Sequence, residues 1–104
     1  MSYVLGNIPK QSVLSITLSP AAVLANTTAE QTFTVNGLVP GDMAVVTKPT
    51  AQAGLGIVGS RVSAANTLAI TFSNNTGSSI TPTASEVYLV LVSRPDRTIP
   101  DGNI

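Results

Sequence analysis

Three short segments of this sequence alternate apolar and polar residues with a period of two, and this alternation limits the fold more than any other feature. The segments are residues 12–18, 31–35 and 67–72. Successive side chains of an extended strand point to opposite faces, so each segment gathers its apolar residues on one face. These residues are Leu14, Ile16, Leu18, Phe33, Val35, Leu68, Ile70 and Phe72. The opposite faces are rich in threonine, which is typical of half-buried antiparallel strands.

Two further segments are apolar almost without interruption, namely residues 43–47 and 87–92. An apolar run of this length fits a strand that is covered on both faces. Such a strand lies either at the centre of the fold or against another subunit, and the sequence leaves both possibilities open.

Turn signals separate these segments. Asn36-Gly37 follows one of them, and Pro40-Gly41 has the residue order of a type II turn. Residues 64–66 suit a short hairpin loop, and a longer polar loop precedes the last apolar run. Residues 20–26 are the one candidate helix, but about six residues are marginal for a helix, so we expect a loop there. Short strands with regular turn signals predict an all-β fold, a small antiparallel β-sandwich of the jelly-roll or Ig-like (immunoglobulin-like) type.

The chain of 104 residues is long enough for one domain. We expect a sandwich domain at residues 12–93, with an extended N-terminal arm at 1–11 and an extended C-terminal arm at 94–104. The arms are either frayed ends or segments that lie on a neighbouring subunit. In the second case, the apolar residues available for protein–protein contact are Tyr3, Leu5, Ile8, Ile99 and Ile104.

Composition removes several classes of function. The chain has no cysteine and no histidine, so thiol nucleophiles, imidazole bases and Cys/His zinc sites are absent. The formal net charge is zero, whereas a nucleic-acid binder needs a basic surface. No apolar run approaches the roughly 20 residues that span a bilayer, and the first ten residues do not resemble a secretory signal. We therefore expect no enzyme, no cofactor, no metal, no nucleic acid and no membrane, and a protein made in a cytoplasm.

Three motifs have a chemical and a structural interpretation. Strands could bring Glu30 and Glu86 together as a carboxylate pair, although solvated carboxylates at strand ends are expected. Residues 54–59 spell G-x-G-x-x-G but lack the following helix of a phosphate-binding loop, so we expect a flexible loop that enters a bulged strand. The N-x-Thr triplets at Asn26 and Asn74 are interpreted as polar turn residues and not as glycan acceptors.

Residues 26–42 and 61–77, together with the closing segment around Tyr88, resemble small β-sandwich virion proteins of tailed bacteriophages, which include head decoration (cement) proteins. The resemblance spans roughly residues 12–93. It implies a non-enzymatic structural virion protein, a homotrimer assembled in the host cytoplasm. Such a capsid decoration protein binds the major capsid protein on the outside of the phage head and stabilises the capsid. The alternative is a carbohydrate- or receptor-binding module of a phage fibre or cell-surface protein.

Overall fold

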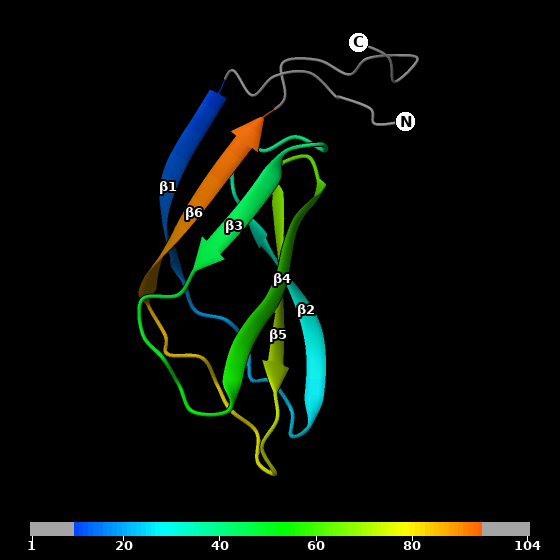
Figure 1. Cartoon of the computed structure of the whole chain (residues 1–104), viewed down its shortest axis with the longest axis vertical. Helices are drawn as coiled ribbons and strands as arrows, with labels where there is room; N and C mark the ends of the chain where they lie inside the picture. Colours follow the sequence, from blue (N-terminus) through cyan, green and yellow to red (C-terminus); the bar gives the residue numbers. More distant parts are fainter. Residues whose placement is uncertain (1–9, 95–104) are drawn as a thin grey trace, which may run out of the picture.

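The computed structural model describes residues 10–94, which form six strands and no helix, so that no helix in this part of the chain could cross a membrane (Figure 1). The residues expected to make protein–protein contacts lie outside the described part of the chain; they are Tyr3, Leu5, Ile8, Ile99 and Ile104. The strands are β1 (Lys10–Leu18), β2 (Thr27–Thr34), β3 (Met43–Thr47), β4 (Leu55–Ala64), β5 (Thr67–Asn74) and β6 (Glu86–Arg94).

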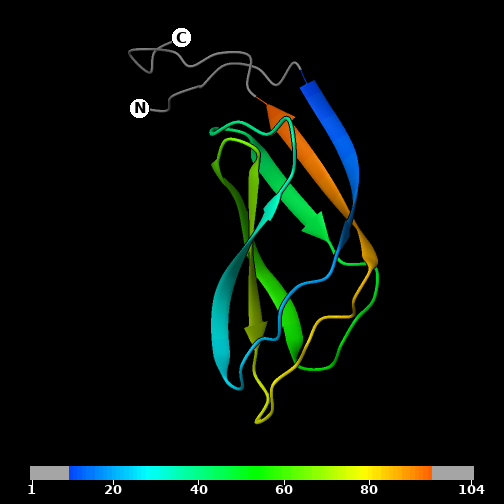
Figure 2. The same cartoon turned by 180° about the vertical axis from the view of Figure 1, so that it is seen from behind.

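The strands pair into two three-stranded antiparallel sheets, in the orders β1-β6-β3 and β2-β5-β4. The two sheets pack as a sandwich, seen from both sides in Figures 1 and 2. If β2 to β6 are equated with strands B to F, the orders B-E-D and F-C of an immunoglobulin domain appear, and β1 occupies the edge beside β6. The expected all-β sandwich is confirmed, and its strand order in residues 10–94 is Ig-like.

The core lies between the central strands of the two sheets. Leu68, Ile70 and Phe72 of β5 face inward and are fully buried. Tyr88 and Val90 of β6 are equally inaccessible to solvent. Full burial of one such side chain contributes about 1.5–3 kcal/mol, so this small cluster accounts for much of the stability. The alternating segments therefore bury the faces that the sequence predicted.

Strand limits differ in detail from the expected ones. The segment 43–47 coincides with β3, whereas β1 and β6 reach Lys10 and Arg94, which the sequence placed in the arms. These two residues pair with one another in the ladder, which extends the sheet to the edge of the described region. The segment 20–26 is not helical, as expected. Its one β-type pairing among the described residues is an isolated bridge between Val23 and Ile80.

The glycine-rich segment 54–59 departs from expectation. It was expected to be a flexible loop, but β4 begins at Leu55 and pairs with β5 along its whole length, so that prediction is wrong for residues 55–59. Ladder hydrogen bonds need only the backbone, so the glycines pair without contributing side chains. The predicted bulge is confirmed, because the register shifts between Ile57 and Gly59.

Two turns hold the end of the sandwich where β3 begins. Gly41 has a φ of 100°, and the Asp42 N–H donates to the Val39 carbonyl at 3.1 Å, which confirms the type II turn. The hairpin residue Asn66 donates from its backbone N–H to Leu38 at 2.8 Å, and its side-chain oxygen accepts from the Gly37 N–H at 2.8 Å. These bonds fix the loop that precedes β3 against the β4–β5 hairpin.

Candidate interaction surface

The outer face of the β1-β6-β3 sheet carries a row of aliphatic side chains. Leu91 on the central strand pairs with Val13 of β1 on one side and with Val45 of β3 on the other. Directly opposed residues project to the same side of a sheet. Leu91 is 39% exposed, Val13 65% and Val45 61%. The row therefore faces solvent across the full width of the sheet.

Further aliphatic residues extend this row along the strands. Val87 and Leu89 project from β6 to the same side as Leu91, and Met43 does so at the start of β3. Six of the nine exposed large hydrophobic residues in the described part of the chain thus lie on one sheet face. We call these six the apolar face: Val13, Met43, Val45, Val87, Leu89 and Leu91.

The apolar face contains no ionisable side chain. The other residues that project to this side are neutral and polar, namely Gln11, Ser15, Thr17, Thr47 and Ser93. Among them Gln11 Nε2 donates to Ser93 Oγ at 3.2 Å. Glu86 and Arg94, at the two ends of β6, project to the opposite side, where Glu86 pairs across from the buried Leu18. The surface consequently stays uncharged over the whole accessible pH range.

The outer face of the β2-β5-β4 sheet has a different character. It is rich in hydroxyl groups and carries a bidentate ion pair in which Arg61 donates to Glu30, with Nε–Oε2 at 2.8 Å and Nη2–Oε1 at 2.9 Å. The hydrogen bond from Arg61 lowers the pKa of the Glu30 carboxyl below its ordinary value. Threonines such as Thr32 and Thr71 surround the pair. This face is a solvated polar surface.

The structure does not bring Glu30 and Glu86 together. They belong to different sheets, and Glu86 accepts a hydrogen bond from Thr50 Oγ1 and lies 2.9 Å from Lys48 Nζ. The hydrogen bonds from Thr50 and then Lys48 lower the pKa of Glu86. Each carboxylate is therefore engaged by its own partner, and the two do not form the paired site that the sequence left open. Within residues 10–94, no three potential metal ligands cluster.

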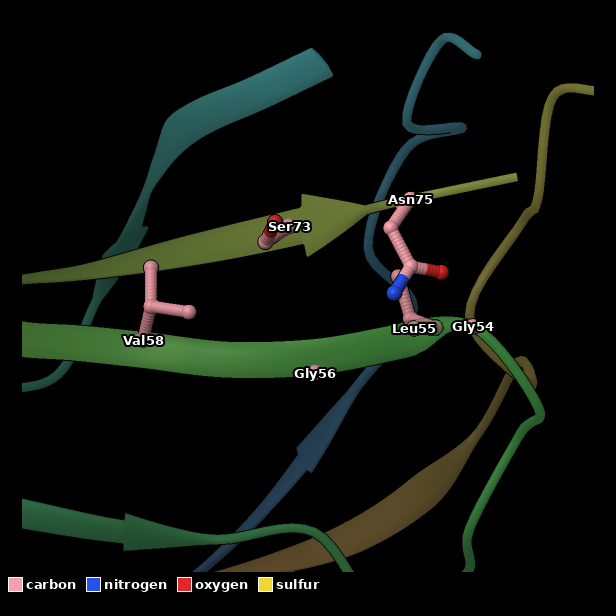
Figure 3. A pocket seen from close by; sticks show the side chains of 6 residues that line it. All are labelled: Gly54, Leu55, Gly56, Val58, Ser73 and Asn75. Carbon is pink, nitrogen blue, oxygen red and sulfur yellow. The ribbon is translucent and has the colours of Figure 1, made fainter. Parts of the chain in front are cut away.

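A shallow groove of about 330 Å³ lies at one end of the β4–β5 pair (Figure 3). Its lining residues are Gly54, Leu55, Gly56, Val58, Ser73 and Asn75. Gly56 lies between Val58 at one end and Asn75 at the other, and nothing occupies the space within 4 Å of the position its Cβ would take. The floor at Gly56 is therefore backbone, flanked by two aliphatic side chains, a hydroxyl and an amide.

The sequence signalled the apolar face only in part. The continuous runs 43–47 and 87–92 indicated strands covered on both faces, and the structure shows that the described residues cover only the inner one. Val13 gave no such signal, because it lies in the alternating segment 12–18 on the face opposite to Leu14, Ile16 and Leu18, where the other residues are polar. No family model matches this chain, and no similar protein was found among curated proteins or solved structures.

Proposed function

We propose that this protein is a structural protein that works by presenting a stiff sheet surface to other proteins. The observation that carries the proposal is the apolar face, an uncharged aliphatic surface on the outside of a hydrogen-bonded sheet. Soluble monomers rarely expose contiguous apolar patches larger than a few hundred Å², and larger ones mark interaction sites. A sheet is also a rigid platform, so little conformational entropy is lost when it docks.

The specific role we propose is that of a capsid decoration protein on the virion of a tailed bacteriophage. The resemblance of residues 26–42 and 61–77 to head decoration proteins supports it, and so does the two-sheet architecture. In this role the major capsid protein is the partner, and an oligomer of this chain binds the outside of the head after assembly in the host cytoplasm. Several subunits that bind one lattice together gain avidity without strong individual contacts.

The test is binding to purified phage heads. The protein is mixed with heads that lack decoration, the heads are sedimented, and the bound protein is quantified as a function of added protein. Saturable binding in a fixed ratio to the major capsid protein, with greater resistance of the heads to heat, is expected. If the protein stays in the supernatant at every concentration, the decoration role is refuted.

A second candidate function, a carbohydrate- or receptor-binding module, is favoured by the groove. Its backbone floor is open at Gly56, and the Asn75 amide and Ser73 hydroxyl stand beside it as neutral hydrogen-bonding groups suited to sugar hydroxyls. Glycan-array binding by the wild type tests this role. Gly56→Val would abolish that binding without disturbing the fold, since the added side chain meets no atom within 4 Å of its Cβ. Head binding that survives Gly56→Val would separate the two functions.

A further inference from the structure

We infer that copies of this chain associate with one another through the apolar face. The inference deepens the proposed structural function, on which it rests, by naming the occupant of this surface as a second copy of the chain. The face thereby accounts for the contact between copies in the proposed structural assembly.

The first argument is the layout of the surface. Val87, Leu89 and Leu91 run along the central strand, and Val13 and Val45 flank Leu91 on the two neighbouring strands. The remaining positions of this face hold Met43 and the neutral side chains Gln11, Ser15, Thr17, Thr47 and Ser93. Depletion of charged residues is a feature that distinguishes the centre of a protein interface. Three strands about 4.8 Å apart and seven residues at about 3.3 Å each give a footprint of roughly 15 by 23 Å. This footprint is about half of the roughly 800 Å² that each partner buries in an interface of standard size, so residues beside the face contribute the rest.

The second argument is that the face is complementary to itself. In a symmetric contact the same residues of the two copies meet around the axis, so any charge there would face its own kind. The apolar face carries no ionisable group, and two copies therefore meet without electrostatic repulsion. Recognition of a different protein commonly relies on complementary charges, and this surface offers none for that purpose.

The third argument is geometric. Twisted sheets pack face to face through their side chains at about 10 Å separation, with strand directions that differ by about 30°. The two sheets of this sandwich already pack in this manner, with β6 central in one of them. A second copy placed on the outer side of β6 would repeat the same packing. The apolar run 87–92 would then be covered on both faces, as its composition indicates.

The experiment measures the oligomeric state of the full chain by sedimentation equilibrium over a wide concentration range. The test variant is Val45→Lys and the matched control is Val58→Lys. Both valines are exposed, at 61% and 63%, and they lie on the outer faces of different sheets. The wild type should sediment as an oligomer. Val45→Lys should raise the dissociation constant at least about 30-fold, because it would bury an unpaired charge in the contact. Val58→Lys should leave it unchanged.

A monomeric wild type, or an equal response of the two lysine variants, overturns the inference. Circular dichroism establishes that both variants are folded, and Val45→Thr, which keeps the shape of valine, gives an intermediate weakening if Val45→Lys does not fold. Head binding separates the two proposals. A monomer that decorates heads refutes the inference alone, whereas an oligomer that dissociates on Val45→Lys but ignores heads supports the inference and refutes decoration.

Discussion

The guanidinium of Arg94 holds the carboxylate of Asp42 through two hydrogen bonds, with Nε–Oδ1 and Nη2–Oδ2 both at 2.8 Å. Arg94 Nη2 also donates to the Gly37 carbonyl at 2.8 Å, and the Val39 N–H donates to Asp42 Oδ2 at 3.1 Å. The Asp42 side chain is 1% exposed. The pair therefore ties the C-terminal end of β6 to the loop that leads into β3.

This pair should make stability depend on pH. The hydrogen bond from Arg94, and to a lesser degree that from Val39, lowers the pKa of Asp42 in the folded state. The folded state therefore binds fewer protons than the unfolded state near the ordinary aspartate pKa of about 3.9, and stability rises with pH there. The contribution is fully present above that value and is lost as pH falls through the lower folded-state pKa. Asp42→Asn should lower the free energy of unfolding at neutral pH by about 1.5–3 kcal/mol and flatten its acid dependence.

The matched control for this prediction is Glu30→Gln. Glu30 and Arg61 form the same bidentate geometry, but the Arg61 side chain is 64% exposed. Exposed pairs contribute little because water and salt screen them. Urea unfolding of both variants at neutral and acidic pH makes the comparison. Equal losses in the two variants would show that burial of Asp42 does not strengthen its pair.

The Asp42–Arg94 pair also shows where inference from the sequence ends. Pro40-Gly41 predicted the turn, because turn chemistry is local. The pairing of Asp42 with Arg94 depends on which strands are neighbours, and alternation of apolar residues does not encode strand order. The same reason explains why the carboxylates of Glu30 and Glu86 could not be assigned to separate sheets from the sequence.

The apolar face illustrates a second limit. The run 87–92 predicted a strand covered on both faces, whereas the described residues cover only its inner face and leave Val87, Leu89 and Leu91 exposed. The sequence does not indicate whether another element of the same chain covers the outer face of β6. Among residues 10–94, no strand lies on that side. The groove was beyond prediction because the sequence indicated a loop at the glycines that line it, although β4 begins at Leu55 and includes Gly56.

Asn74 should be among the least replaceable polar residues of the domain. It is buried, its amide Nδ2 donates to the carbonyls of Val23 and Ser78 at 3.0 and 2.8 Å, and its Oδ1 accepts from Thr76. An amide with both hydrogens donated inward is no glycan acceptor, in agreement with the expected turn role. Asn74→Ala leaves these groups without partners and should cost at least about 2 kcal/mol.

Asn75→Ala is the matched control for Asn74→Ala. The neighbouring asparagine is exposed, and its backbone N–H, which bonds to the Gly54 carbonyl at 3.0 Å, is retained in the variant. Loss of the Asn75 side-chain amide should change the midpoint of urea unfolding only slightly. Similar midpoints for the two variants would contradict the structural role assigned to Asn74.

Gly54 and Gly56 should respond in opposite ways to alanine. Gly54 has a φ of 81°, and an added Cβ would lie 2.2 Å from Thr76 Cγ2, so Gly54→Ala combines a clash with an unfavourable backbone conformation. We expect a loss of about 1–3 kcal/mol. Gly56→Ala meets nothing within 4 Å and lies in a strand, where alanine is favoured over glycine by about 0.5–1 kcal/mol. The thermal unfolding midpoints of both variants measure these effects. A Gly54→Ala variant that is more stable than the wild type would rule out the positive φ of Gly54 and its close approach to Thr76.

Tyr88 presents the opposite case to Asn74, a buried polar group that lacks a partner. Its ring is fully buried in the core, and its hydroxyl has no hydrogen-bonding partner among residues 10–94. Burial, and then the charge of Glu86, raises the pKa of the phenol above its ordinary value. Because the folded state keeps this proton more tightly, the associated stability is present below the unfolded-state pKa of about 10 and is lost as pH rises through the higher folded-state pKa.

Tyr88→Phe should therefore leave the stability unchanged or raise it by up to about 1 kcal/mol, because it keeps the packed ring and removes a desolvated hydroxyl. It should also reduce the loss of stability in strongly alkaline solution. Urea unfolding of the wild type and the variant at neutral pH and near pH 10–11 measures both effects. A loss greater than about 1 kcal/mol at neutral pH would mean that the hydroxyl makes a hydrogen bond in the folded protein, and the assignment of Tyr88 as an unpaired core group would fall.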